Sequence, residues 1–478
     1  MPASMKADAI IVPPPSGGDD SAMLDELIAS ANNGERPIYF PVGIWRASNL
    51  NRPAARVVIE GEPGAWITSV DNPNPGRLTQ VLTLGSGSRV STIGIDGNIA
   101  GHAQPMSFVA GIWVRGGDVR LDHVVVRNCS SQGIAAQNVA DLAIQAGEID
   151  NTSHNSIWVN GCPRTKVLGC TIGRCGFSNI FILNSPASLI YDNVIGPSGP
   201  VGAGIYPQGS RNLIIRANVI RRARGGIEAW TPFADSPEHA RALMEQASGM
   251  VIDGNDVSEN YNGGISVSSN GAVIRGNRIA KNGHGGVNSQ TLVTEPGIKL
   301  DTRYPGSGYQ VGDILTLVGG EGEPARVMVC MVWDGGRLFN TVGTDVAIYP
   351  VSMGDYEVPP RNPVEVTGGH GAGARMIYTN EGAPGMRYSQ NYKWTFGLAT
   401  VGPMRGALIE KNKIRRNLGA GIVFHEIGPN FLGKASETRI RKNVIRRNQF
   451  SVKGKTGNKP FDDVWPASNI FTGNKGYP

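Results

Sequence analysis

The sequence predicts an all-β solenoid, in which the chain winds into stacked coils around one continuous core. The main observation is a repeat in which a small residue is followed by Ile or Val about every 22 to 25 residues. Units of this length cannot bury their apolar face alone and stack on their neighbours instead. The repeat is anchored at Ile112, Ile134, Ile157, Ile180, Ile205, Ile227, Ile265, Val287 and Ile422.

Composition supports strands joined by tight turns. The 478 residues include 65 glycines and no long run of Ala, Leu, Glu and Lys. The net charge of +6 is spread along the repeats without a recognition motif, so we expect no nucleic-acid partner. Residues 1–18 carry no apolar stretch, so we expect a soluble chain with no membrane partner and no visible signal peptide. The five cysteines lack CxxC spacing and are expected to be buried thiols.

The N-terminal segment predicts one helix over residues 20–34. Met23, Leu24, Leu27 and Ile28 form its apolar face, Asp20 or Ser21 can cap it, and Gly34 can end it. Its place before the first strands suits a lid over the open end of a stacked core. Two short strands around a Pro-Val-Gly turn follow at 37–46.

Each regular coil shows two strands, the Gly-Ile strand and one that ends in an apolar pair and Asn. Asn tolerates left-handed dihedrals, and its amide can bond to the equivalent amide of the next coil. We therefore interpret these residues as structural: Asn193, Asn218, Asn255, Asn277, Asn412 and Asn443.

Coils of this length, with short strands and stacked Asn, resemble the right-handed parallel β-helix of the pectin-lyase-like superfamily. The segment 37–46 is similar to the strand–Pro-x-Gly–strand entry of that superfamily and of phage tailspikes. The resemblance covers about residues 35–295 and 386–475, and implies a single-stranded solenoid. It leaves the chemistry open, because the superfamily includes lyases, hydrolases, epimerases and non-catalytic adhesins.

Breaks in the period predict the domain organisation. We expect an N-terminal segment with a capping helix over 1–34, the first part of the β-helix over 35–293, and its last coils and tail over 385–478. Between them, 294–384 carries Gly-Gly-x-Gly turns between alternating strands. This pattern predicts an inserted small β-rich domain, similar to Gly-rich modules of phage tail proteins.

Outward positions of the Gly-Ile strands form columns down the stack. If each anchor points inward, the residues one and three positions later point outward, about 4.8 Å apart from coil to coil. Rings and amides in such columns suit a polysaccharide or oligosaccharide, whose C–H faces stack on rings while its hydroxyls bond to amides. A subunit contact or a covering loop would also account for them. The expected substrate-binding residues are Trp113, Trp158, Asn160, Phe181, Tyr206, Gln208, Trp230 and Gln290.

Glu228 follows the aromatic run in the same column, and the break after it supplies Asp235 and Glu238. Glycoside hydrolysis uses two carboxylates, so these three are candidate catalytic residues. His425, with Glu426 beside it, is a fourth candidate that could move a proton in a lyase or epimerase. The alternatives are an ordinary acid paired with Arg224 and an idle surface His. No Asp cluster for a calcium-dependent lyase is seen, and no metal or cofactor is expected.

Together these patterns favour a polysaccharide-cleaving protein of glycoside hydrolase type, resembling a tailspike depolymerase. The alternatives are a non-catalytic glycan-binding tailspike or adhesin, a structural virion protein, and a polysaccharide lyase or epimerase on the same fold. The resemblance also implies a homotrimer in an extracellular or virion-associated setting.

Overall fold

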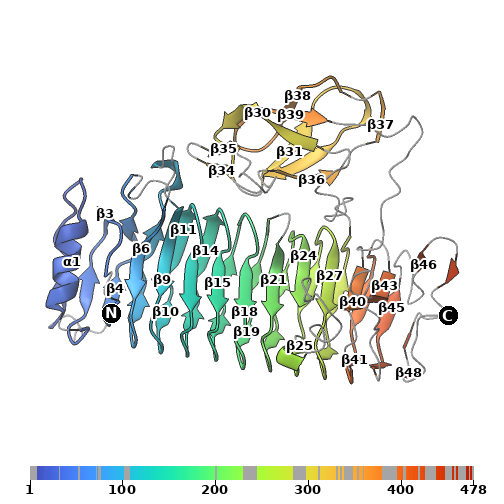
Figure 1. Cartoon of the computed structure of the whole chain (residues 1–478), viewed down its shortest axis with the longest axis horizontal. Coiled ribbons are helices and arrows are strands. Elements are labelled where there is room, and N and C mark those ends of the chain that lie inside the picture. Colours follow the sequence, from blue (N-terminus) through green and yellow to red (C-terminus); the bar gives the residue numbers. More distant parts are fainter. Residues whose placement is uncertain are drawn as a thin grey trace.

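The computed structural model is an elongated right-handed parallel β-helix (Figure 1). An α-helix lies at the N-terminal end of the β-helix, and a small β-domain lies alongside its coils. The fold class expected from the sequence is confirmed. The structure describes residues 8–475 except 102–107, 230–244, 284–297, 339–347, 379–395, 426–437, 447–454, 461–469 and shorter gaps at 32, 52–53, 72, 74–76, 200–201, 311–312, 330–331, 334–335, 353–354, 359, 402–404, 418–419, 457–458 and 473. No helix in this described part is long and apolar enough to span a membrane.

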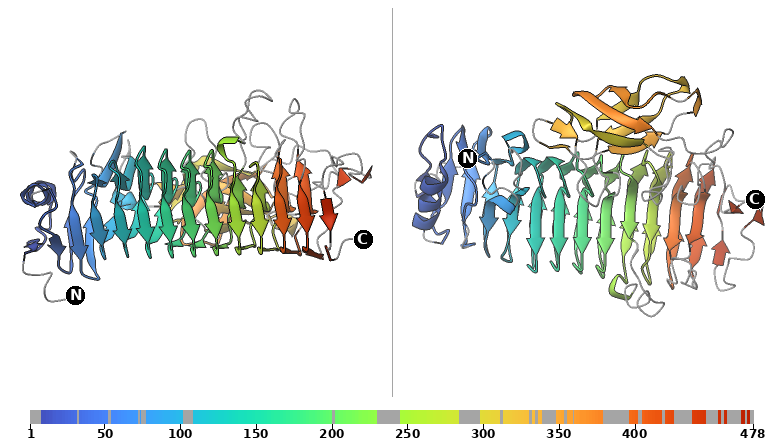
Figure 2. Two further views of the ribbon diagram at one scale, coloured as in Figure 1. Left: turned by 90° about the horizontal axis from the view of Figure 1, so that it is seen from below. Right: turned by 45° about the horizontal axis from the view of Figure 1, so that its top comes forward.

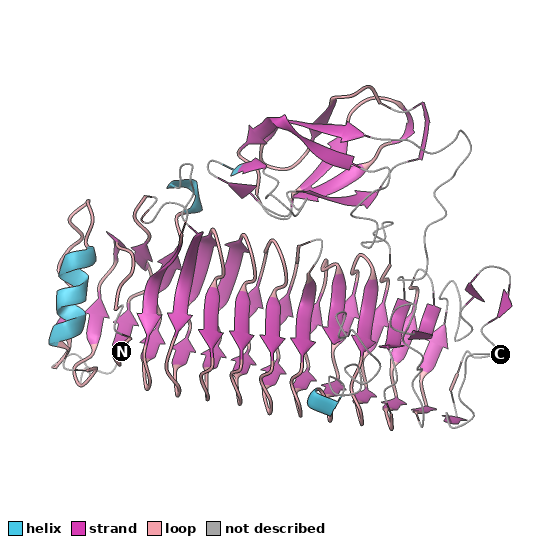
Figure 3. Cartoon of the chain, in the orientation of Figure 1, coloured by secondary structure: helices cyan, strands magenta, loops and turns pink. Residues whose placement is uncertain are grey.

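Three parallel sheets form the β-helix, and Figure 3 shows their strands as successive rungs. Sheet A has 14 strands: β1 Ile10–Ile11, β2 Ile38–Phe40, β4 Val58–Gly61, β7 Arg89–Ser91, β10 Arg120–Asp122, β13 Ala143–Gln145, β16 Lys166–Leu168, β19 Leu189–Tyr191, β22 Ile214–Arg216, β25 Val251–Asp253, β28 Val273–Arg275, β41 Leu408–Glu410, β44 Arg439–Arg441 and β48 Ile470–Thr472.

Sheet B has 12 strands: β3 Gly43–Arg46, β5 Ala65–Thr68, β8 Gly94–Asp96, β11 Val125–Cys129, β14 Glu148–Thr152, β17 Thr171–Ile172, β20 Val194–Ile195, β23 Val219–Ile220, β26 Asp256–Ser258, β29 Arg278–Ala280, β42 Lys413–Arg415 and β45 Val444–Arg446. Sheet C has 10 strands: β6 Leu78–Leu84, β9 Phe108–Val114, β12 Ile134–Gln137, β15 Ile157–Asn160, β18 Ile180–Leu183, β21 Ala203–Gln208, β24 Gly225–Ala229, β27 Gly263–Val267, β40 Phe396–Val401 and β43 Ala420–His425.

The anchors of the repeat form one buried column in sheet C. The strand register pairs Ile112 with Ile134, and the series continues unbroken to Ile205 and Ile227. These side chains have no exposed area or almost none, and they belong to a single core cluster that runs the length of the β-helix. Figure 2 shows the same alignment of successive coils from two sides.

Two expectations about the coils are corrected. Each coil has a third strand, that of sheet B, which the sequence pattern missed because several of these strands, such as β20, contain only two residues. After Ile265 the next anchor is Leu398 and not Val287, because β40 pairs with β27. Val287 lies outside the described residues. The column then continues to Ile422, as expected.

Asn residues form an amide ladder where sheet A turns into sheet B. Asn193 Nδ2 donates to Asn218 Oδ1 at 2.8 Å, and the same bond recurs through Asn255, Asn277, Asn412 and Asn443 to Asn474. The structural role is confirmed, but half of its rationale was wrong. The left-handed residue is the one before each Asn, such as Asp192, Ala217 or Lys411, so Asn is there for its amide.

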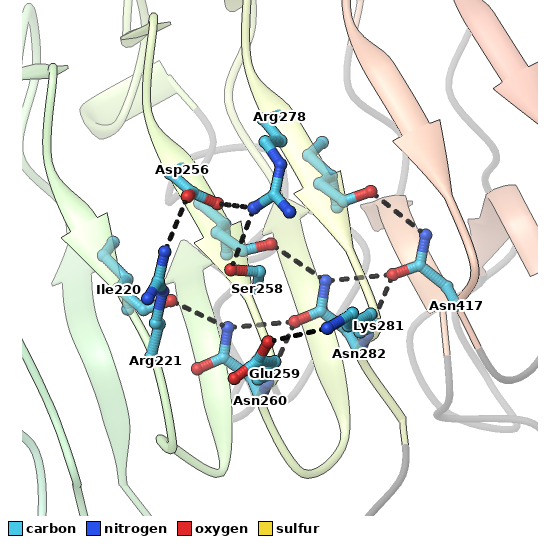
Figure 4. Close-up of polar contacts among 12 residues, drawn as sticks. Ile220, Arg221, Asp256, Ser258, Glu259, Asn260, Arg278, Lys281, Asn282 and Asn417 are labelled. Atoms are coloured by element: carbon cyan, nitrogen blue, oxygen red, sulfur yellow. Dashed lines mark hydrogen bonds and ion pairs between the residues drawn. The ribbon is translucent and has the colours of Figure 1, made fainter.

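A second, shorter ladder lies where sheet B turns toward sheet C. Asn260 Nδ2 donates to Asn282 Oδ1 at 2.9 Å, and Asn282 Nδ2 to Asn417 Oδ1 at 3.0 Å (Figure 4). On the outer face of sheet B, Asp256 pairs with Arg221 at 3.1 Å and with Arg278 at 2.6 Å. Buried amides and exposed ion pairs thus join the same coils on opposite faces.

The helix α1 Ser21–Ser30 covers the N-terminal end of the core, with Leu24 and Ile28 buried in the same cluster as the first strands. The helix is shorter than expected. It ends before Gly34, and Asp20 makes no side-chain capping bond, because its carboxylate accepts the backbone N–H groups of Ser16 and Arg46 instead.

The expected inserted domain is confirmed as a separate antiparallel sheet with its own core. Its order is β30 Ile298–Ser307, β39 Ala372–Tyr378, β38 Val364–Thr367, β31 Ile314–Leu317, β33 Arg326–Val329 and β36 Ile348–Ser352. Two short pairs accompany it, β32 Glu321–Glu323 with β37 Asp355–Val358 and β34 Val332–Trp333 with β35 Arg337–Leu338. Near the C-terminus, β46 Lys455–Thr456 pairs with β47 Lys459–Pro460. In the first part of the β-helix, a short 3-10 helix spans Ile99–Gly101 after β8.

We expect Asn255→Ala to lower the free energy of unfolding by about 3 kcal/mol, because it removes buried hydrogen bonds to Ile215 and Asn277 and leaves partners unsatisfied. Urea unfolding followed by circular dichroism measures the change. Gln145→Ala is the control, since it removes an exposed amide of sheet A. Equal, small effects of the two substitutions would contradict a stabilising ladder.

Candidate functional site on sheet C

The outer face of sheet C carries the aromatic column that the sequence predicts. The register places Trp113 beside Ala135, Ala135 beside Trp158, Trp158 beside Phe181, and Phe181 beside Tyr206. All four rings are partly exposed. The Phe181 and Tyr206 rings lie 5.2 Å apart, and those of Trp113 and Trp158 lie 6.4 Å apart across Ala135.

Amide side chains follow the rings in the second outward column. Asn160 pairs in register with Leu183, and Leu183 with Gln208. Gln208 Nε2 donates to the Tyr206 hydroxyl at 3.0 Å, and both amide residues are partly exposed. The structure therefore brings Asn160 and Gln208 beside the rings, as the alternation of the strands predicts.

Two further rings extend the column toward the edge where sheet B passes into sheet C. Phe177 lies 6.3 Å from Phe181, and the His154 ring stacks on Phe177 at 5.4 Å. The alternation of strand residues does not predict Phe177, because Phe177 lies in the turn before β18. Its signal was an aromatic residue four positions before Phe181 at the entry to the strand.

Glu228 occupies the coil after Tyr206, since the register pairs Ile205 with Ile227. Its carboxylate is buried, with the whole residue 7% exposed, and so it is not the ordinary exposed acid of the alternative interpretation. Arg224 Nη1 lies 3.5 Å from Glu228 Oε2, and Oε2 makes no hydrogen bond to any residue that the structure describes. The pairing with Arg224 is present, but it is buried.

The protonation of Tyr206 depends on this environment. Desolvation first, and then the negative charge of Glu228, raise the pKa of the Tyr206 hydroxyl above its ordinary value. The phenol therefore remains protonated at neutral pH and can donate a hydrogen bond. The carboxylate, guanidinium and phenol of these three residues lie together at the Tyr206 end of the described aromatic column, whereas Arg115 lies over the Trp113 ring at the other end.

Gly225 leaves space for the Glu228 carboxylate. A Cβ on Gly225 would lie 2.0 Å from Glu228 Oε1, so any larger residue there would displace the carboxylate from its present position. Glu228 pairs in register with Ser266 of β27, whose hydroxyl is also buried.

The inserted domain docks along the edge between sheets B and C. Arg174 pairs with Asp150 and donates to the Gln310 side chain of the inserted domain. Ser153 Oγ donates to Val332 O at 3.5 Å, and Ile99 joins the apolar core of the inserted domain. The domain therefore lies against the turns that carry Ser153 and Arg174, and Figure 1 shows it above the coils.

The remaining expected site residues are not brought into this group. Trp230, Asp235, Glu238 and Gln290 lie outside the described residues. His425 ends β43 and pairs in register with Val401, but the structure does not describe its side chain. The second carboxylate of a hydrolase pair thus stays a prediction.

Comparisons with known proteins found one family model and several solved structures. A family model described as "Periplasmic copper-binding protein (NosD)" matches residues 115–293, which is less than half of the chain. No curated protein matches the chain.

Among solved structures, the Azotobacter vinelandii mannuronan C-5 epimerase AlgE4 A-module matches at 12% identity, with a TM-score of 0.48, over 98% of this chain and 94% of that one. An alginate lyase from Paenibacillus sp. str. FPU-7 matches at 14% identity and a TM-score of 0.38, over 54% and 93%. The tailspike gp49 of Acinetobacter baumannii bacteriophage Fri1, a capsular polysaccharide depolymerase, matches at 11% identity and 0.37, over 77% and 85%. At these values the likenesses carry no argument about activity.

We expect Arg224→Ala to destabilise the fold by about 3 kcal/mol, because it leaves the buried Glu228 charge without its partner. Adding Glu228→Gln should recover much of this loss, since the double variant buries no unpaired charge. Urea unfolding measures both. Lys281→Ala is the control, because Lys281 and Glu259 are both exposed in their ion pair and its loss should cost about 1 kcal/mol or less. If Arg224→Ala lowers the free energy of unfolding no more than the control does, the charges of Arg224 and Glu228 are solvated.

Proposed function

We propose that this protein binds a polysaccharide along sheet C and cleaves it by hydrolysis at Glu228. The observation that carries the proposal is one column of partly exposed rings that leads to a buried carboxylate, one oxygen of which makes no hydrogen bond to any residue that the structure describes. Rings at coil spacing suit a linear polymer, whose successive sugars can stack on successive coils. A chain bound on them would reach the coil of Glu228.

In the proposed reaction the binding residues are Trp113, Trp158, Phe181, Tyr206, Asn160 and Gln208, with Trp230 and Gln290 as further proposed contacts. Glu228 is the proposed acid or nucleophile, and Asp235 or Glu238 the second carboxylate that glycoside hydrolysis requires. Arg224 Nη1, 3.5 Å from Glu228 Oε2, would position the carboxylate for this role.

A lyase or epimerase reaction is the second candidate, and Tyr206 favours it. Elimination or epimerisation of a uronic acid needs a group that delivers or removes a proton next to a neutralised carboxylate. The protonated Tyr206 phenol and the Arg224 guanidinium, both near Glu228, have these properties. His425 is a further proposed proton carrier for this reaction.

Copper binding, which the name of the matching family suggests, does not fit the described residues. Within them no three His, Cys, Asp or Glu side chains gather at a metal-binding distance. Four cysteines are buried free thiols, and desolvation raises the pKa of Cys175 to about 12, so its thiolate is disfavoured.

We expect Glu228→Gln to lower the cleavage rate by about a hundredfold or more while glycan binding persists, because the amide cannot act as an acid, base or nucleophile. Incubation with a panel of bacterial and plant polysaccharides measures it. New reducing ends without double-bond absorbance indicate hydrolysis, and the absorbance indicates elimination. Glu410→Gln, the same change in another buried acid with an Arg partner, is the control. Unchanged cleavage by Glu228→Gln would exclude this site.

We expect Trp158→Ala to weaken glycan binding about tenfold, because it removes one stacking platform. Calorimetry with the cleaved polysaccharide, or with Glu228→Gln as a non-cleaving background, measures the affinity. Tyr191→Ala removes an exposed ring of sheet A and is the control. If Trp158→Ala instead leaves binding unchanged and dissociates a homotrimer, sheet C is a subunit contact and the structural alternative holds.

A further inference from the structure

A depression of about 340 Å³ lies on the edge where sheet C turns into sheet A, away from the rings of the aromatic column. Its lining comes from β10, β13 and β16 and from the turns before them, in three successive coils. It is formed by Asp118, Arg120, Asp141, Leu142, Ala143, Gln145, Arg164 and Lys166.

The depression exists because a small residue lies between two cations. The register places Arg120 beside Ala143 and Ala143 beside Lys166, so all three occupy one outward column of sheet A. Successive strands are about 4.8 Å apart, which separates the two cationic residues by roughly 10 Å along the stack. The methyl group of Ala143 leaves the space between them open.

Arg120 and Lys166 differ from the other cations of this region. Arg89 pairs with Asp118 at 2.8 Å, and Arg164 forms two hydrogen bonds of 2.7 Å with Asp141. Among the residues that the structure describes, Arg120 and Lys166 make no ion pair within 4 Å, and both side chains are exposed. Two cations therefore remain available to a ligand.

The acids of the depression indicate what kind of anion fits. Hydrogen bonds from Arg89 and Arg164 hold the pKa values of Asp118 and Asp141 below their ordinary range, so both remain carboxylates. They make the lining a mixed surface of cations and carboxylates, which suits a ligand with hydroxyls between its anionic groups better than a nucleic acid, which needs an unbroken basic surface. They would accept hydrogen bonds from hydroxyl groups, as would the exposed Gln145 side chain.

We propose that this depression is a second glycan site, which takes a segment of an acidic polysaccharide. Two anionic groups of the segment pair with Arg120 and Lys166, and its hydroxyls lie over Ala143 and bond to Asp141 and Gln145. That the ligand is a saccharide rests on the proposed function, whereas the pair of cations does not. The site needs no part of the Glu228 group.

Its position suggests a use. In one coil, Gln137 ends the sheet C strand β12 and Ala143 begins the sheet A strand β13, so the two surfaces meet around a single turn. A long acidic chain held on sheet A would keep neighbouring segments of the same polymer close to the rings of sheet C. Retention of this kind acts through effective concentration.

The test is calorimetry on the full chain with a short oligouronate and a neutral oligosaccharide of the same length. The double variant Arg120→Ala/Lys166→Ala should bind the oligouronate at least about tenfold more weakly, because two charge-assisted contacts are lost. Ala143→Trp, which fills the depression and leaves both charges, should weaken it as well. Added salt should weaken binding to the unmodified chain.

The matched control is Lys413→Ala/Arg439→Ala, which removes two exposed cations outside the depression and should leave the affinity unchanged. Trp158→Ala tests the two proposals separately. It should leave oligouronate binding at the depression unchanged, whether or not sheet C binds a glycan. Three outcomes would overturn the proposal. The first two are that the unmodified chain fails to bind the oligouronate and that it prefers a single-stranded oligonucleotide. The third outcome is that Arg120→Ala/Lys166→Ala and Ala143→Trp bind the oligouronate as tightly as the unmodified chain does.

Discussion

The constraint on which the structure depends is the register between successive coils. Each backbone bonds to the coils before and after it, and the buried anchors and Asn amides repeat at the same positions. A slip of one residue would turn every inward Ile of a coil outward and break the amide ladder at that level. Because neighbouring coils are the main contacts of each coil, stability accumulates along the stack.

The same register turns sequence spacing into surface chemistry. Residues one period apart become neighbours, so Phe181 and Tyr206, separated by 25 positions, bring their rings to 5.2 Å. It also sets the spacing of Arg120 and Lys166 around Ala143. Both proposed glycan sites are therefore consequences of one repeat, read on two faces of the same coils.

The sequence predicted the features that the repeat period controls. It did not predict the features that depend on the turns and the insertion. The anchors, the Asn ladder and the aromatic column follow from strict alternation and were predictable. The burial of Glu228, its contact with Arg224 and the extra ring of Phe177 depend on turns whose paths no period sets. Leu398 was missed for another reason, since the chain returns to β27 only after a long insertion and the nearer Val287 matched the spacing.

The return of β40 to β27 also dictates the order in which the molecule can fold. The coil that β29 leaves open is closed only when β40 arrives, more than a hundred residues later along the chain. Closing so long a loop costs more entropy than closing an ordinary coil. During synthesis, the coils before the insertion can assemble while the last ones are still being made. The insertion thus divides a continuous solenoid into a long early part and a short late part.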